Sequence, residues 1–252
     1  MAIARAQNPV TAKNNSGTAL TTGAFSSSTT STNAIVVVCW LWSSNSTGTF
    51  PTNAVTDNKS NTYTRRQISS QGMSGGTAVT AIFESQNITG GASHTITVTP
   101  TGTQSALIVG ATEYSGVLTA NAQDVGNVAS GESASATTGT TATTAQNDEV
   151  FIGVGTLQGN INMTENASGS TPASGWTPIV TESDGDNYQS GEAVDVVATA
   201  TAAADHFWSH TSAPWAGAIE TYKAAAAAGR TALLTRSNPL GMNIGMGWRM
   251  PI

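Results

Sequence analysis

The chain has 252 residues, of which only 10% are charged, and a formal net charge of −6. Ordinary soluble domains carry roughly 25% charged residues, whereas Thr, Ser, Ala and Gly fill this sequence. Its 38% apolar content is enough for a folded core, and the bias towards Thr, Gly and Asn favours β structure over disorder. No apolar run approaches the ~20 residues that span a bilayer, and no basic cluster marks a nucleic-acid surface, so neither partner is expected.

In chain order, the first clear element is the continuously apolar run 34–42, which predicts a buried strand. It contains the single cysteine, Cys39, which we expect to be a small buried hydrophobe. Residues 95–99 alternate Thr with apolar side chains and predict a strand with one wet face, while 105–111 and 149–154 predict further central strands. Turn-rich clusters at 57–61, 89–91 and 183–187 separate the strands.

The sequence repeats itself. A Thr/Ser/Gly-rich segment from residue 16 leads into the apolar strand near 35, and a similar segment from residue 130 leads into the strand near 150, an offset of 114. Later, Glu113 matches Glu220 within similar motifs. We therefore predict an all-β, antiparallel, jelly-roll-like β-sandwich over residues 1–222, built from two similar halves, about 16–116 and 130–222. Two separate sandwiches remain the alternative to one body.

Charge divides the chain into an acidic body and a basic arm. Every acidic residue lies between Asp57 and Glu220, and residues 57–222 contain three cations against all 15 acids, a net of −12. The arm, 223–252, contains Lys223, Arg230, Arg236 and Arg249 and no acid.

The arm ends in a strand pattern, because every second residue from 242 to 252 is large and apolar. Such a row is an aggregation hazard in water and has to be covered, either by the chain's own body or by strand addition to a neighbouring subunit. The opposite charges of arm and body favour the neighbour. The predicted assembly-contact residues are Arg230, Arg236, Met242, Ile244, Met246, Trp248, Arg249, Met250 and Ile252.

Few motifs point to chemistry. Residues 72–76 match G-x-S-x-G, but that nucleophile motif needs a following helix, and here a strand is predicted. His206 and His210 lie in a predicted strand, where residues four apart are ~13 Å apart and cannot share one zinc ion. Asp184, Asp186 and Asn187 form the best calcium candidate, although an acidic hairpin turn is favoured. We predict no enzyme, no catalytic residue, no metal and no cofactor.

Short motifs resemble those of uncharacterised β-sandwich proteins of bacterial and phage genomes. They are the Val-Thr-Asp turn at 55–57 with Asn-Thr-Tyr at 61–63, the Asn-Ile-Thr-Gly-Gly-Ala segment at 87–92, and Glu-Tyr-Ser-Gly at 113–116. The resemblance supports the fold more than the role; by analogy, such jelly-roll proteins include phage capsid decoration, or cement, proteins and tail components. Together with the low charge, the lack of an active-site motif and the apolar C-terminal row, it leads us to predict a virion structural protein, assembled in a host cytoplasm. Such a protein would stabilise the phage head by forming a homo-oligomer, for instance a trimer, on a major capsid or other virion protein.

The alternative function is a carbohydrate- or receptor-binding module of a tail fibre or cell-surface protein. Its sugar-stacking platform would use Trp40, Trp42, Trp176, Trp208 or Trp215. Most tryptophans of a sandwich belong to the core, so this hypothesis ranks second.

Overall fold

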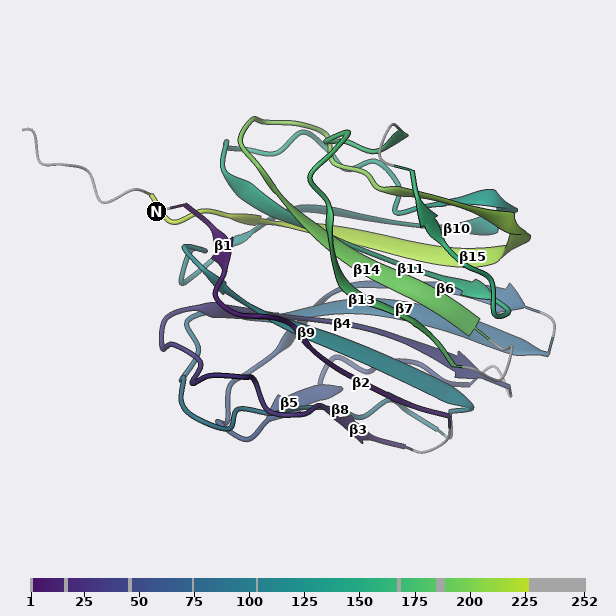
Figure 1. Cartoon of the computed structure of the whole chain (residues 1–252), viewed down its shortest axis with the longest axis horizontal. Coiled ribbons are helices and arrows are strands. Elements are labelled where there is room, and N and C mark those ends of the chain that lie inside the picture. Colours follow the sequence, from purple (N-terminus) through teal and green to yellow (C-terminus); the bar gives the residue numbers. More distant parts are fainter. Residues whose placement is uncertain are drawn as a thin grey trace, which may run out of the picture.

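The computed structural model describes residues 2–15, 18–44, 47–73, 75–102, 104–166, 169–184 and 189–226. Over these ranges the chain is all-β, with antiparallel strands and no α-helix. Two large sheets stack face to face, and a small third sheet lies against the outer face of the first (Figure 1). The predicted antiparallel sandwich is confirmed.

The first half of the chain forms the first six-stranded sheet. Its central strand, β4 (Ala34–Ser43), is buried along its whole length, as the continuous apolar run predicts. β4 lies between β9 and β7; β6 forms one edge of the sheet, and β1 and β2 pair with β9 at the other. The bounds are Ala4–Arg5 for β1, Val10–Asn14 for β2, Thr64–Met73 for β6, Gly76–Ser85 for β7 and Ala106–Ser115 for β9.

The second half forms the second six-stranded sheet around β11 (Glu149–Gln158). β11 lies between β15 and β14, with β10 and β13 at the edges and the short β12 paired with β15. The bounds are Gln123–Thr137 for β10, Thr164–Glu165 for β12, Thr177–Ser183 for β13, Gln189–Ala198 for β14 and Phe207–Lys223 for β15.

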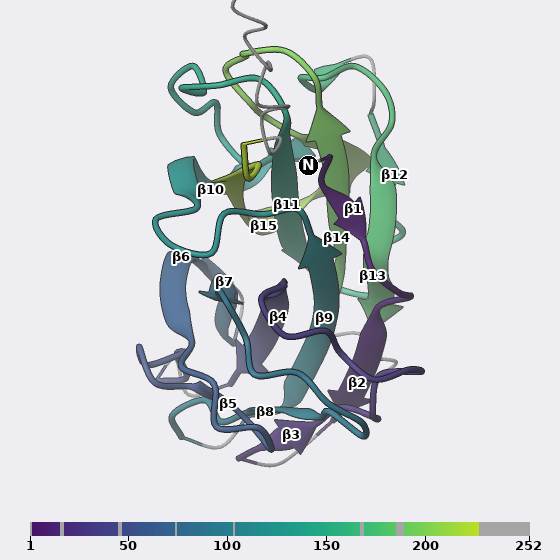
Figure 2. The same ribbon diagram turned by 90° about the vertical axis from the view of Figure 1, so that its left-hand side faces the viewer.

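Both sheets have the same connectivity. The strands of each large sheet can be numbered one to five along the chain if β1 and β2 are counted together and β12 is left out. In both sheets the spatial order of the strands is then 1-5-2-4-3. The internal repeat that the sequence predicts is therefore a repeat of topology. Each half makes one of the two large sheets, and the first half adds the small third sheet (Figure 2).

The repeat slips by one residue at its most similar motif. Tyr114 and Tyr222 both lie in the core between the large sheets. Glu113 instead accepts bonds on the outer face, from the Thr30 N–H and Asn33, whereas Glu220 accepts one from Gln67 between the sheets. Because strand side chains alternate, one extra residue before the second tyrosine moves the glutamate to the other face. The sequence match of the two glutamates thus pairs residues of opposite faces, and the tyrosines are the equivalent pair.

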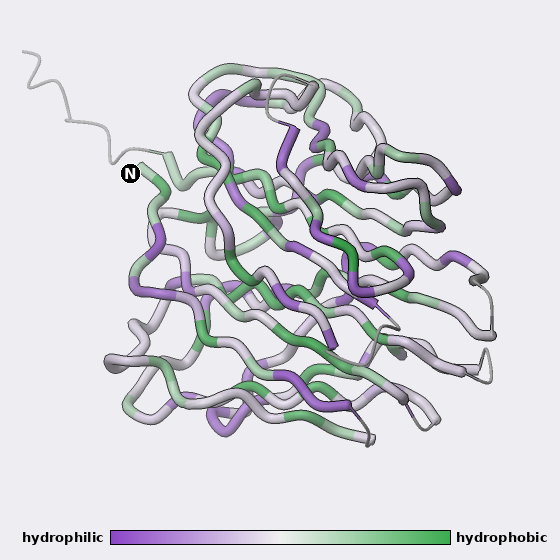
Figure 3. The backbone as a smooth tube through the Cα atoms, turned by 45° about the vertical axis from the view of Figure 1, so that its right-hand side comes forward, coloured by the Kyte–Doolittle hydropathy of each residue, from purple (hydrophilic) through white to green (hydrophobic). Residues whose placement is uncertain are grey.

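The described residues form four clusters of buried apolar side chains, the smallest of which consists of Trp42, Ala78 and Ala106. Figure 3 shows hydrophobic stretches of backbone in both halves of the chain. The central cluster joins the two large sheets and includes Trp40 of β4 and Val154 of β11. A second core fills the space between the first large sheet and the three-stranded sheet of β3 (Leu20–Thr21), β8 (Ile96–Val98) and β5 (Val55–Asp57). A third, containing Trp208, lies on the outer face of the second sheet. Each half has its own core, and the shared core joins them into one body.

The described C-terminal residues belong to the sandwich. β15 ends at Lys223, which pairs with Asp124 at 3.7 Å and donates its backbone N–H to Ala122. The N–H groups of Ala224 and Ala225 donate to Asp148 and Gly116. The sequence placed Lys223 in the arm, but its position shows that the body extends at least to these residues. The rest of the predicted arm, 227–252, lies outside the described residues.

Candidate functional site

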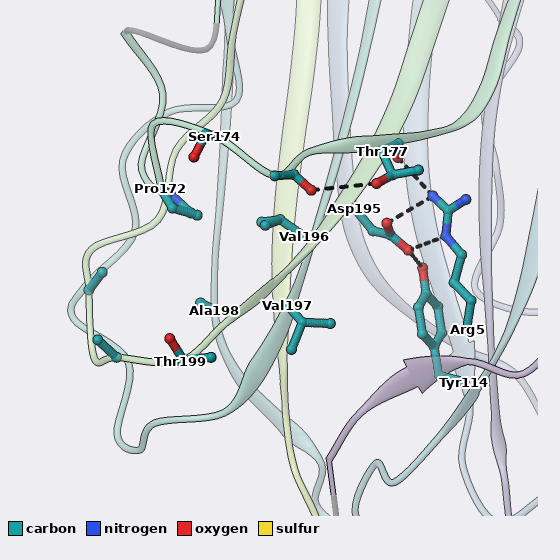
Figure 4. A pocket seen from close by; sticks show the side chains of 13 residues that line it. Arg5, Tyr114, Pro172, Ser174, Thr177, Asp195, Val196, Val197, Ala198 and Thr199 are labelled. Carbon is teal, nitrogen blue, oxygen red and sulfur yellow. Dashed lines mark hydrogen bonds and ion pairs between the residues drawn. The ribbon is translucent and has the colours of Figure 1, made fainter.

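The clearest polar site joins the N-terminal strand to both sheets. Arg5 of β1 binds the Asp195 carboxylate of β14 with two bonds, from Nε at 2.7 Å and from Nη2 at 2.8 Å. Nη2 also donates to the Thr177 carbonyl at 2.7 Å, and the buried Tyr114 hydroxyl donates to Asp195 (Figure 4). A buried acid has to be paired, and here the Arg5 and Tyr114 side chains share that role for Asp195.

The electrostatics of this cluster follow from burial and from the Asp195 charge. Burial, and then the neighbouring carboxylate, raise the pKa of Tyr114 far above its usual value. Burial alone lowers the pKa of Arg5, but the bonds to Asp195 and its charge outweigh that effect and raise it. The arginine and the tyrosine therefore keep their protons at neutral pH, and we call the cluster of Arg5, Tyr114 and Asp195 the clamp.

A hollow of about 610 Å³ lies next to the clamp. This size falls within the ~300–1,000 Å³ of typical binding pockets. Its wall includes Val197, one of only two large hydrophobic side chains among the described residues that are strongly exposed, at 40%. The lining residues are Arg5, Tyr114, Pro172, Ser174, Gly175, Thr177, Asp195, Val196, Val197, Ala198, Thr199, Ala200 and Ala202.

The hollow forms because β13 separates from β14 there. Their ladder ends at the pair Thr177 and Asp195, while β14 continues for three more residues, 196–198, that pair with β11 alone. Gly175 has a φ of +92°, a conformation that suits glycine, and Trp176 donates its Nε1–H to the Pro172 carbonyl at 2.8 Å. The segment before β13 thus turns away from the sheet and leaves one edge of β14 open.

Two buried carboxylates lie between the sheets at the opposite edge of the sandwich. Glu84 of β7 pairs with Arg66, and Glu220 of β15 accepts a bond from Gln67 at 2.8 Å. Burial raises the pKa of Glu84, and raises that of Glu220 to about 7 with a contribution from the Glu84 charge. Their exposures are 3% and 0%, so the pair has no open face for a substrate. Glu149 at the start of β11 is a third such group, because burial, and then Asp124, raise its pKa to about 7.

The two buried histidines occupy equivalent places in the halves. The His94 carbonyl accepts from the Phe25 N–H, and the His206 carbonyl from the Thr138 N–H. His94 bonds Asp57 at 2.7 Å through Nε2, whereas the His206 ring is edge-on to Trp176 and Trp208. Burial lowers the pKa of His206 to about 3, so its ring is neutral. Both rings are buried, and within the described ranges no three His, Cys, Asp or Glu side chains gather as a metal site.

Other sequence-based candidates are resolved in part. Gly72 and Met73 end β6 and Gly76 begins β7, with Met73 paired with Gly76, while Ser74 lies outside the described residues. Asp184 is buried, and its carboxylate accepts from the Gln189 N–H, which closes the β13–β14 turn. Asp186 and Asn187 of the calcium candidate lie outside the described residues, as do all the assembly-contact residues: Arg230, Arg236, Met242, Ile244, Met246, Trp248, Arg249, Met250 and Ile252.

The five tryptophans proposed as a sugar-stacking platform belong to the cores. Trp40, Trp42, Trp176, Trp208 and Trp215 are between 0% and 7% exposed. None of them therefore presents a ring face to solvent. Cys39 is likewise fully buried, and burial raises the pKa of its thiol well above the usual value, as expected of a small core side chain.

Sequence reasoning missed the clamp, although one signal was present. Asp195 is the only charge within an otherwise apolar stretch of β14, and a charge there needs a partner. The identity of that partner could not be predicted, because Arg5 is 190 positions away.

Comparison with known proteins identifies no relative: no family model, no curated protein and no solved structure matches the chain. Within the described residues there is no helix of the length and hydrophobicity needed to cross a membrane. The chain is therefore characterised by its architecture, an all-β protein of antiparallel sheets in two topologically equivalent, sandwich-like halves.

Proposed function

We propose that this chain is a structural protein of a phage particle, most concretely a capsid decoration protein. It binds the head as a homo-oligomer and stabilises it through contacts of the sandwich and of the basic C-terminal segment. The proposal rests on how the chain distributes its charge and its apolar residues between these two parts.

The charge distribution is the observation that carries the proposal. The described residues contain six Lys and Arg against fourteen Asp and Glu, a net of −8, and four of the six cations already pair within the body. Residues 227–252 contain three arginines and no acid. An acidic body and a basic segment in one chain are complementary in head-to-tail contacts between copies.

The apolar row of 242–252 gives such contacts a second component. Six large apolar residues alternate there with Asn, Gly, Arg and Pro. This is the pattern by which an extended segment adds to a sheet edge, with main-chain bonds giving affinity and alternate side chains filling pockets. Through such a segment, a decoration protein could lock neighbouring subunits together.

The test compares the full chain with a chain truncated after Ala226, which retains every described bond of β15. Capsids stripped of this protein are mixed with each chain, and their melting temperature and bound protein are measured. We expect the full chain to bind and to raise the melting temperature, and the truncated chain to do so much less. Binding should weaken with added salt, because contacts between opposite charges at the surface are screened.

A charge-matched control separates the apolar row from the arginines. In the full chain, Trp248→Ala leaves the net charge unchanged and should reduce capsid protection almost as much as truncation does. Equal protection by the full and truncated chains would remove the segment from the proposal, and absence of capsid binding by both would remove the decoration role itself. Mass measurement of both chains in solution gives the oligomeric state.

A further inference from the structure

We propose that, in the free protein, the hollow beside β14 holds the chain's own segment 242–252. The hollow would cover the apolar row until the protein assembles. This inference concerns the isolated chain and goes beyond the proposed function, since it holds or fails whatever the particle partner is.

The hollow has the two features that an added strand needs. The open edge of β14 at 196–198 has no ladder partner on the β13 side, and no other backbone bond reaches it among the described residues. Next to this edge the wall is largely apolar, with Val197 exposed at 40%. The clamp lines one side, where Arg5 and Asp195 neutralise each other (Figure 4). An apolar strand can therefore enter without burying an unpaired charge.

The segment matches these features. Its apolar residues fall on one face, so several of them can enter the hollow while the backbone pairs with β14. Glycines at 245 and 247 lie on the other face, where they allow the loop before β13 to approach closely. The segment's only charge, Arg249, also lies on that face.

The position of the hollow favours the chain's own segment over that of a neighbour. Ala198 at the end of β14 pairs with Glu149, and Glu149 pairs with Lys223 at the end of β15. The hollow, on the far side of β14, therefore lies about 15 Å, three strand spacings, from the end of β15. The intervening residues 227–241 span up to about 50 Å when extended, which is more than enough. A linker of this kind gives an effective concentration on the order of 1 mM.

Thiol labelling at Val197 tests the proposal in the full chain. Val197→Cys places a reactive group in the wall, while the native Cys39 is fully buried and contributes little background. We expect Cys at 197 to react about tenfold more slowly in the full chain than in the chain truncated after Ala226, which is the protection given by a segment with an intrinsic Kd near 0.1 mM. Val128→Cys is the matched control, because Val128 is also 40% exposed but lies on β10 at the far edge of the same sheet.

Each outcome decides the matter. Protection at 197 but not at 128, unchanged on dilution and abolished by Trp248→Ala, supports docking of the chain's own segment. Equal labelling of 197 in the full and truncated chains overturns the proposal, and so does protection that survives Trp248→Ala. Protection that disappears on dilution assigns the hollow to a neighbour's segment instead. Capsid binding is not part of this experiment, so its result is separate from that of the decoration role.

Discussion

Replacing the buried Glu220 with glutamine should stabilise the protein, and by an amount that depends on pH. Burial raises the pKa of Glu220 from its usual 4.5 to about 7, so the folded protein prefers the neutral acid. Between these pH values the folded state binds more protons than the unfolded state. The contribution of Glu220 to stability is therefore fully present below pH 4.5 and is lost as the pH rises towards 7.

The size of the effect follows from the shift. The pKa of Glu220 differs by about 2.5 units between the unfolded and the folded protein. Each unit corresponds to about 1.36 kcal/mol of folding free energy, so the shift amounts to about 3 kcal/mol at most. Glutamine is close to isosteric and is never charged, and its amide oxygen can still accept the bond from Gln67. We therefore expect Glu220→Gln to change the free energy of unfolding little at pH 4.5 and to raise it by about 2–3 kcal/mol at pH 8.

Equilibrium unfolding in urea at pH 4.5, 6, 7 and 8 measures this difference. Glu132→Gln is the control, because Glu132 is exposed on β10, and its effect should be small at every pH. A gain for Glu220→Gln that stays constant with pH, or that grows as the pH falls, would refute the assignment of a buried, neutral acid.

Three further predictions test the clamp and the cores. Arg5→Ala leaves the Asp195 carboxylate buried without its cation and should cost about 3–5 kcal/mol in urea unfolding, against less than about 1 kcal/mol for Lys13→Ala at an exposed ion pair. The His206 ring should show no titration by NMR between pH 8 and 5, because its pKa is about 3, and a transition near pH 6.5 would contradict its burial. Gly110→Ala should cost about 1–3 kcal/mol in the same assay, since a Cβ there would lie 2.7 Å from a valine of the facing sheet; an unchanged midpoint would show that the sheets can separate.

The sequence predicts the strands and the duplication because both leave local signals. The apolar run 34–42 became the fully buried β4, and 149–154 became the first part of β11. Alternation at 95–99 likewise predicted β8 and its two faces. In each case the pattern of neighbouring residues depends on burial, which is the property that decides where a strand lies.

Contacts between distant segments leave no such signal. Arg5 and Asp195 lie in different halves, and only the packing of one sheet on the other brings them together. Similarly, the matching motifs around Glu113 and Glu220 hide a one-residue slip that only the strand register reveals. The hollow was also unpredictable, because it depends on where β13 leaves β14 and not on any residue type.

Ala2 and Ala226 line the same small hollow, so the described chain enters and leaves the body at one pole (Figure 1). The β6–β7 hairpin lies at the opposite pole. A fusion partner attached directly at Ala2 or at Ala226 would therefore project from the same side and leave the far hairpin unobstructed. Because these two residues are close, a short linker could also join them in a circularly permuted chain of residues 2–226 whose new ends open elsewhere on the surface, with both large sheets intact.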